Sequence, residues 1–286
     1  MSQPCHVLPA SCEDGAYYLG RPGNLHPIDG GFGGISRKWN DKTTIRYTAA
    51  GQPRAQVADT RPYREWSFTV EDSLPEQYAA IHDLITTDPG PFVMVEPYAQ
   101  VTNLLTPEAS TFSTLHNYNR GGRWRTSDGG AVPHVILNPN ASPTNEAQLW
   151  TGAGPVPPTP REVTASAYVS GTDAWVILMF TDMDDNWIEW ANSPTVTSLG
   201  SLHRLSVTAT PPSNAVGAWV IAARANVAAR AALTWTPFAT DWTIGGLAQQ
   251  CVVTGVNDTV GQAGYGRGWT RRASVGFTVT EVGGIT

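Results

Sequence analysis

The chain of 286 residues has few charged side chains and almost no lysine. Charged residues make up 15% of it, against about 25% in an average globular protein. Lysine occurs only at Lys38 and Lys42, so arginine supplies nearly all of the positive charge. The formal net charge of −6 argues against a nucleic-acid partner, because binding to a phosphate backbone needs a basic face. A surface so poor in charge suits either a subunit buried in an assembly or a surface of small polar residues.

The sequence also lacks a long apolar run and a secretion signal. No stretch approaches the roughly 18 consecutive apolar residues of a membrane-spanning helix. Residues 1–18 have neither the basic nor the apolar region of a signal peptide, and carry Glu13 and Asp14 instead. We therefore expect a chain that is made in the cytoplasm and does not insert into a membrane.

Cysteine is rare and its spacing is uninformative. Cys5 and Cys12 lie near the start of the chain and Cys251 lies far from them. Three cysteines do not form a disulfide framework. Cys5, His6 and Cys12 do not have the spacing of a zinc site, and no second pair follows. We expect three reduced thiols, no metal and no cofactor.

The usual catalytic motifs are missing. The sequence contains no Gly-x-Ser-x-Gly and no His-Glu-x-x-His. The glycine-rich segment 261–268 precedes a predicted strand, so it lacks the helix N-terminus that binds phosphate. We expect no catalytic residues and a protein that is not an enzyme.

What the sequence does contain is a series of strands between Arg161 and Trp242. Residues 162–170 alternate between apolar and polar side chains, as in a half-buried strand. Residues 174–180 are apolar throughout, as in a strand covered on both faces. Further strands are predicted at 187–190, 204–210, 217–223 and 231–236. Strands at this spacing, separated by turn residues, predict a β-sandwich or barrel.

Residues 221–233 are ambiguous within this series. Their alanine and arginine content favours a helix. They have no capping residue, however, and Asn226 interrupts them. We interpret the segment as two strands joined by a loop.

One helix is predicted in the first hundred residues. Ser73 is a candidate N-cap, Glu76 completes a capping box, and Pro75 lies in the first turn, where its missing N–H costs nothing. The turn residues 88–90 end the helix. Flanking strands are predicted at 43–48, 64–70 and 91–97, which makes this part an α+β unit.

The two ends of the chain differ from its middle. Residues 1–35 are rich in glycine and proline and predict an arm or extended loop, and residues 254–272 predict a glycine-rich turn region. Residues 274–282 alternate as a strand, and the triplet beginning at Phe277 repeats the triplet beginning at Phe68. We infer that the end of the chain returns to pair with the first domain. The middle of the chain would then be an insertion in the first domain. Such an insertion costs little stability when the two ends that it joins lie close together.

An acidic cluster follows the apolar strand, and it has three interpretations. Asp182, Asp184 and Asp185 suit a hairpin turn, in which such side chains bond to their own backbone. They also have the hard oxygen ligands that calcium prefers. With Glu189 they contain the two carboxylates that a glycosidase needs.

Aromatic residues are the best candidates for binding. Sugars stack their apolar faces on flat rings, and the chain has 11 tryptophans. Trp175, Trp219 and Trp235 lie in apolar runs and are interpreted as core. The candidates for an exposed carbohydrate-binding platform lie beside polar or arginine-rich segments; they are Tyr118, Trp124, Trp187 and Trp190.

Several segments resemble known families. Residues 103–105, 164–171, 205–212 and 219–221 resemble the jelly rolls of carbohydrate-binding modules, which are attached to glycosidases and to phage tail proteins. Residues 64–68, 76–85, 91–97 and 277–283 resemble the distal-tail or minor tail proteins of long-tailed phages that infect actinobacteria. In that family the flanking domain forms a ring at the end of the tail tube and the inserted module points outward. The family has no short signature for binding residues, so none is transferred.

The resemblance implies a mainly β protein, with a jelly-roll β-sandwich inserted into a small tail-ring domain that is α+β or barrel-like and has one helix. The expected boundaries are an arm at 1–35, a tail-ring domain at 36–100 and 242–286, and a sandwich at 101–241.

The function that it implies is that of a structural protein of the virion tail tip. Its expected partners are further copies of itself in a ring, which we expect to be hexameric, the tail tube, other tail-tip proteins and a host-surface glycan. The alternatives are a free-standing lectin-like protein and a cell-wall polysaccharide hydrolase.

Overall fold

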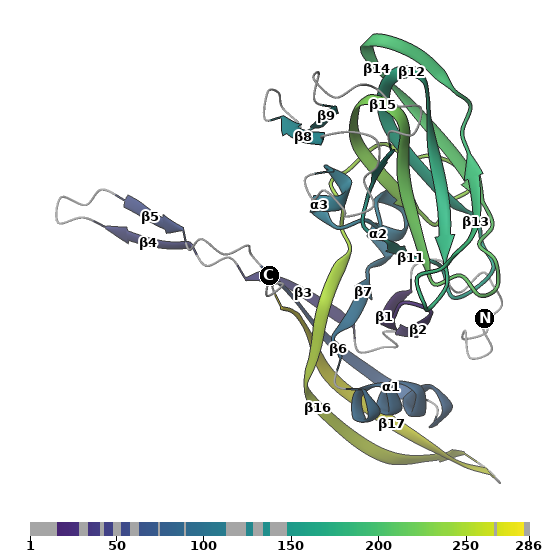
Figure 1. Cartoon of the computed structure of the whole chain (residues 1–286). Helices are drawn as coiled ribbons and strands as arrows, with labels where there is room; N and C mark the ends of the chain where they lie inside the picture. The colour runs from purple at the N-terminus through teal and green to yellow at the C-terminus, as the bar shows by residue number, and fades with distance from the viewer. Residues whose placement is uncertain are drawn as a thin grey trace. The chain divides into compact units, whose positions relative to one another are not determined.

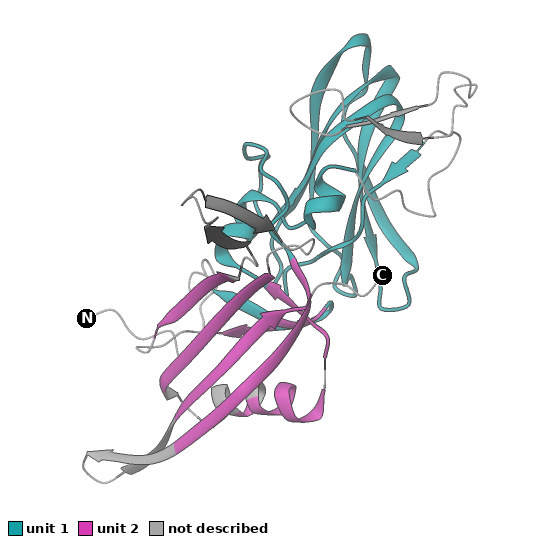
Figure 2. Ribbon diagram, turned by 90° about the vertical axis from the view of Figure 1, so that its left-hand side faces the viewer, with its two compact units in different colours: residues 1–18, 22–25, 95–247 teal, residues 19–21, 26–94, 248–286 magenta. Residues whose placement is uncertain are grey.

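The computed structural model forms two compact units (Figures 1 and 2). Unit 1 comprises residues 1–18, 22–25 and 95–247, and unit 2 comprises residues 19–21, 26–94 and 248–286. The structure describes residues 16–28, 34–40, 43–47, 53–57, 63–73, 75–88, 90–112, 124–127, 134–137, 148–265 and 268–282. The fold is mainly β, as predicted.

Unit 2 is built on a seven-stranded sheet with the order β2-β1-β7-β16-β17-β6-β3. Its strands are β1 (Tyr17–Arg21), β2 (Asn24–Ile28), β3 (Ile35–Asn40), β6 (Tyr63–Ser73), β7 (Phe92–Val95), β16 (Ala248–Tyr265) and β17 (Gly268–Glu281). A separate hairpin pairs β4 (Thr43–Tyr47) with β5 (Pro53–Val57). The interpretation of residues 1–35 as an arm is wrong for their second half, because β1 and β2 are strands of this sheet.

The predicted return of the chain's end to its beginning is confirmed. Strand β17 pairs antiparallel with β6, and Phe277 lies opposite Phe68. The two phenyl rings stack with their centroids 4.9 Å apart. Arg64 on β6 donates to both carboxylate oxygens of Glu281 on β17, at 2.8 and 3.0 Å, so an ion pair closes the end of the pairing.

The glycine-rich region 254–272 is not a turn region, and that prediction is wrong. Strands β16 and β17 pair continuously from Cys251↔Glu281 to Tyr265↔Gly268, with one register shift between Thr254 and Asn257. Glycine has only a weak preference against strands, and here the partner strand supplies the hydrogen bonds that hold each segment extended.

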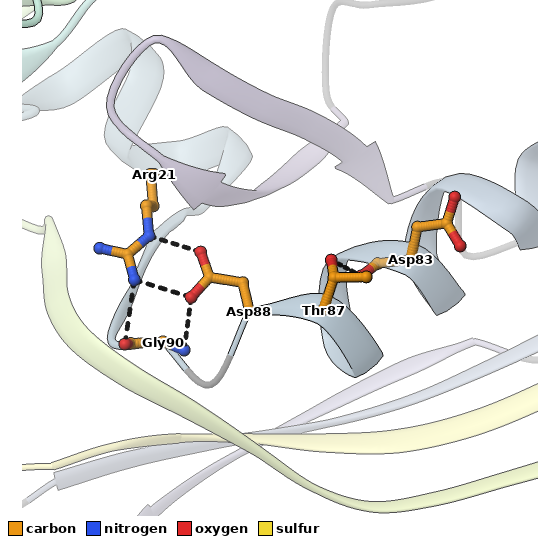
Figure 3. A network of polar contacts seen from close by, with 5 residues as sticks. All are labelled: Arg21, Asp83, Thr87, Asp88 and Gly90. Carbon is orange, nitrogen blue, oxygen red and sulfur yellow. Dashed lines mark hydrogen bonds and ion pairs between the residues drawn. The ribbon is translucent and has the colours of Figure 1, made fainter.

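Helix α1 (Pro75–Thr87) confirms the helix prediction and contacts β17. Ser73 is the last residue of β6, and Leu74, where the helix would be capped, lies outside the described residues. Figure 3 shows how the helix ends: the Asp88 carboxylate accepts hydrogen bonds from Arg21 Nη2 (2.7 Å) and the Gly90 N–H (2.9 Å). The hydrogen bond from Arg21, followed by that from Gly90, lowers the pKa of Asp88 to about 2. The helix therefore ends where it was predicted to end, at residues 88–90, in a turn whose Asp88 carboxylate forms an ion pair with Arg21 of β1.

Unit 1 contains an eight-stranded sheet arranged around two long strands, β12 and β15 (Figure 1). The sheet's strands are β8 (Trp124–Ser127), β9 (His134–Leu137), β10 (Gln148–Trp150), β11 (Gly154–Pro155), β12 (Val163–Thr181), β13 (Trp187–Asn192), β14 (Val196–Ala209) and β15 (Gly217–Thr234). Two short helices, α2 (Pro97–Thr102) and α3 (Pro107–Ser110), precede it, and neither is predicted from the sequence. None of the helices in the described residues is long and apolar enough to cross a membrane.

Two long strands replace four predicted short ones. The ranges 162–170 and 174–180 form the single strand β12, and 217–223 and 231–236 merge into β15 without the predicted loop. Each long strand is irregular where a break was expected: β12 shifts register around Gly171, and Arg224 and Arg230 of β15 have positive φ of 49° and 55°. Bulges of this kind absorb an extra residue and bend a strand without ending it.

The bulges divide the sheet into two halves that share β12 and β15. In the first half, residues 163–169 of β12 lie between β14 and the end of β15. In the second half, residues 174–181 lie between β13 and the start of β15. One face of the second half is fully buried; its core residues are Ala174, Val176, Leu178, Phe180, Ala218, Val220 and Ala222.

Candidate functional site

The opposite face of the second half-sheet carries exposed tryptophans at its edge strand, β13. The side chains of Trp187 and Trp190 are 48% and 62% exposed. Both were candidates for a binding platform on sequence grounds, and the structure places them on the same strand of unit 1. Single exposed aromatic rings are normal on a protein surface, whereas exposed apolar side chains gathered on one face can mark a site for a ligand or partner.

An irregularity in β13 puts both tryptophans on one face. Residues three apart in a regular strand point to opposite faces. Here Trp187 pairs with Thr181 and Trp190 with Met179, and the register shifts between them, so that Ile188 is an additional residue. Because Thr181 and Met179 lie two residues apart on β12 and share a face, Trp187 and Trp190 share it too.

Two buried tryptophans pack behind Trp187, one against its ring and the other against the first. Trp150 on β10 and Trp219 on β15 are only 2% and 5% exposed and form a small apolar cluster with Met179 and Ile221. The Trp150 ring centroid lies 5.3 Å from that of Trp187 and 5.9 Å from that of Trp219. Packing on both sides limits the rotamers of Trp150, which gives Trp187 a rigid neighbour. We call Trp187, Trp190, Trp150 and Trp219 the tryptophan face.

The indole N–H groups behind this face are satisfied inside the protein. Trp150 Nε1 donates to Gln148 Oε1 at 3.2 Å, and Trp219 Nε1 donates to Thr181 Oγ1 at 3.4 Å. The exposed Asn192 lies on the same face, opposite Ile177. The face therefore combines flat apolar rings with an amide that can donate to and accept from hydroxyl groups.

The tryptophans interpreted as core divide into two kinds. Trp219 and Trp235 are buried, as predicted, and Trp235 Nε1 donates to the Pro155 carbonyl at 3.0 Å. The interpretation is wrong for Trp175, which is half-buried and has the Arg224 guanidinium carbon 5.3 Å from its ring centroid. The positive φ of Arg224 turns its side chain toward that ring, and nothing local in the sequence indicates this backbone conformation.

The remaining two candidates are not placed in this site. Tyr118 lies outside the described residues, and of Trp124, the first residue of β8, the structure describes only the backbone. Trp150 was not among the candidates chosen from the sequence. The neighbouring apolar residues Leu149 and Trp150 were the one available signal, and two residues are too few to predict a strand.

The acidic residues after β12 form the predicted hairpin turn. The Asp182 carboxylate accepts hydrogen bonds from the Asp184 N–H at 3.0 Å and the Asn186 N–H at 2.9 Å. These bonds, led by that from Asn186, lower the pKa of Asp182. Asp185 has a φ of 63°, which Asp tolerates better than most residues. The described residues contain no group of three or more His, Cys, Asp or Glu side chains arranged to hold a metal ion.

Cys251 is a buried residue of unit 2. Burial, with the nearby Glu281 carboxylate as a second cause, raises the pKa of its thiol to about 12. A thiol held protonated in this way is a poor nucleophile and a poor metal ligand. Cys5 and Cys12 lie outside the described residues.

Comparison with known proteins gives only distant similarities. No family model matches the sequence, and no curated protein matches it significantly. Half of the chain is similar to 22% of the enzymatically active domain of tailspike protein 4 from bacteriophage CBA120, with 13% identity and a TM-score of 0.36. A carbohydrate-binding module from Cellvibrio mixtus lichenase 5A is also similar. The match covers 42% of this chain and 92% of the module, at 11% identity and a TM-score of 0.29.

The structure of the CBM22-1 and GH10 modules of a Clostridium thermocellum endo-1,4-beta-D-xylanase is also similar. The match covers 46% of this chain and 29% of that one, with 14% identity and a TM-score of 0.31. The chain therefore spans less than a third of the tailspike and xylanase structures. At such TM-scores the similarities carry no argument about function, which must come from the residues themselves.

Proposed function

We propose that the tryptophan face binds a glycan. The observation that carries this proposal is the geometry of Trp187 and Trp190: two exposed rings on one face of one strand, the first of them packed against the buried ring of Trp150, which in turn contacts Trp219. Pyranose rings present apolar C–H surfaces that stack on such rings, while their hydroxyls need polar partners such as Asn192. Because the rings of Trp150 and Trp219 are buried and already held in place, little conformational entropy is lost when a sugar is bound.

We further propose that the chain is a structural protein of a phage tail tip, and that the glycan lies on the host surface. Two features support this role. Unit 2 contains residues from both sides of segment 95–247, so that the main part of unit 1 is an insertion between β7 and β16. The segments that form β6, α1, β7 and β17 are those that resemble distal-tail proteins. In this role the location is the virion tail tip, and the partners are further copies of the chain and neighbouring tail proteins.

Substitution of the exposed tryptophans tests glycan binding. We expect Trp187→Ala and Trp190→Ala each to weaken binding about tenfold to hundredfold, because burying an aromatic ring against a ligand contributes roughly 1.5–3 kcal/mol. Affinity electrophoresis in gels containing xylan, β-glucan or actinobacterial cell-wall glycan measures this. Trp39→Ala, which removes a 54% exposed tryptophan from unit 2, is the matched control and should leave the mobility unchanged. A wild-type chain retarded by none of the three polymers would rule the proposal out.

Electron microscopy of the purified full chain tests the structural role separately. We expect ring-shaped particles with sixfold symmetry, formed through unit 2 and unaffected by Trp187→Ala. A chain that stays monomeric at high concentration but binds glycan would instead be a free-standing lectin-like protein.

A further inference from the structure

The first half of the unit 1 sheet carries a second group of residues that the tryptophan face does not include. Tyr168 lies on the central strand β12, and Arg204 lies directly opposite it on β14. Arg230 projects from the bulge in β15, on the other side of β12, where its φ is 55°. Trp242 comes from the segment that follows β15. Figure 1 shows the three strands side by side.

These four side chains lie in the order Arg204, Tyr168, Arg230 and Trp242, so that guanidinium groups alternate with aromatic rings. The guanidinium carbon of Arg204 lies 5.9 Å from the centroid of Tyr168, and that of Arg230 lies 5.4 Å from the same centroid. Arg230 is also 5.7 Å from the centroid of Trp242. All four residues are half-buried, so the rings shield the guanidinium groups from part of the solvent without closing them off. A guanidinium in such surroundings is weakly hydrated and retains its N–H donors for another partner.

Several of these donors have no acceptor among the residues that the structure describes. Arg204 Nη2 donates to the Ser166 hydroxyl at 3.2 Å and to the Thr240 carbonyl. Arg204 Nε is buried without a hydrogen-bond partner. The hydroxyl oxygens of Thr240 and Thr243, which lie within two residues of Trp242 in sequence, are also buried without a hydrogen-bond partner. Within the described part of the chain, Arg230 contacts the two aromatic rings and forms no hydrogen bond or ion pair. Buried donors without acceptors are costly, and each one in a native protein calls for an explanation.

The positive charge of the group is also not balanced by a carboxylate in the described ranges of the chain. No carboxylate of the described residues forms an ion pair with Arg204 or Arg230. Asp241, next to Trp242 in sequence, is exposed and pairs with neither. Two uncompensated arginines beside one ring stand out in a chain whose formal net charge is −6.

We propose that Arg204 and Arg230, with Tyr168 between them and Trp242 beside Arg230, form a binding site for an oxyanion, either a carboxylate or a phosphate. Both groups accept the paired N–H donors of a guanidinium, and such charge-assisted bonds are about twice as strong as neutral ones. The site belongs to the first half of the sheet, whereas the tryptophan face belongs to the second half. It binds its ligand independently of the glycan site.

Nuclear magnetic resonance of the full chain tests the site with small probes. The arginine Nε–Hε signals are followed while inorganic phosphate, D-glucuronate or D-glucose is added at constant ionic strength. We expect saturable shifts of the Arg204 and Arg230 signals with phosphate, glucuronate or both, and none with the uncharged glucose. A response to phosphate alone would assign a phosphate ligand, and a response to glucuronate alone a carboxylate ligand.

Three variants make the result specific. Arg230→Gln should weaken the response at least tenfold, and because Arg230 forms no hydrogen bond with any residue that the structure describes, this variant should remain folded. Arg230→Lys keeps the charge but not the planar set of donors, and should bind more weakly than the wild type. Arg37→Gln is the control, since Arg37 of unit 2 also lies over a tryptophan ring, that of Trp39. If no probe gives a saturable shift, or if Arg230→Gln responds like the wild type, the group is only a structural stack and the proposal is wrong.

Discussion

Replacing Asn103 with alanine is expected to destabilise unit 1 by about 3–5 kcal/mol, the range seen when a buried hydrogen-bond network is broken. Asn103 is fully buried and makes four hydrogen bonds. Its amide nitrogen donates to the carbonyl oxygens of Ala231 and Thr243, both at 2.9 Å. Its amide oxygen accepts from the N–H groups of Leu105 and Leu233 at 3.1 and 3.2 Å. Alanine would remove all four bonds, and of these backbone groups the Ala231 carbonyl would still accept a hydrogen bond from Trp242 Nε1, at 3.1 Å.

Urea denaturation followed by tryptophan fluorescence measures this loss. Asn103→Asp should be destabilised to a similar extent, because a carboxylate cannot donate to the two carbonyls and its charge would be buried. Asn214→Ala is the matched control, since Asn214 is exposed, and it should change the unfolding free energy by no more than about 0.5 kcal/mol. A loss below about 1 kcal/mol for Asn103→Ala would mean that water or repacking satisfies these groups.

Replacing Gly171 with alanine is expected to cost about 3 kcal/mol, at the upper end of the usual effect of overpacking. Gly171 lies where β12 shifts register against both of its neighbours. A Cβ atom there would overlap the carbonyl oxygen of Arg224 and would lie 3.1 Å from the Ala225 Cα. Both obstacles are backbone atoms of β15, which cannot rotate away as a side chain can. The two long strands would have to separate at the point where they bend.

The control for this substitution is Gly200→Ala. Gly200 belongs to β14 of the same sheet, and a Cβ atom at this position would have no neighbour within 4 Å. Its replacement should be neutral or stabilising by up to about 1 kcal/mol, since alanine restricts the unfolded chain. Equal melting temperatures for the two variants would show that β12 and β15 do not approach each other closely at Gly171.

Features set by short stretches of chain were predictable. Helix α1 was recognised from Pro75 near its start and from Asp88 at its end, both of which act through neighbouring backbone groups. The turn at Asp182 was recognised for the same reason. The pairing of β17 with β6 was predicted from two similar alternating segments, because alternation specifies which side chains must lie on the buried face.

Features that depend on a partner strand could not be predicted from the sequence. A loop was expected where β15 continues, because Asn226 interrupts the segment and no helix cap is present. Arg224 and Arg230 instead adopt positive φ within the strand, which local preferences reserve for glycine and asparagine. The strand persists because β12 supplies hydrogen bonds on both sides of each bulge. For the same reason the glycine-rich end of β16 is extended, since β17 pairs with it.

By itself the amino-acid sequence determined the mainly β character of this protein, the position of its one long helix and the identity of Trp187 and Trp190 as exposed rings, because alternation, caps and polar neighbours act over a few residues. Only the tertiary structure decided that these rings share a face supported by Trp150 and Trp219, and that Arg204 and Arg230 flank Tyr168. Those arrangements depend on the register between strands distant in sequence and on the bulges that shift it, and no local pattern of side chains encodes either.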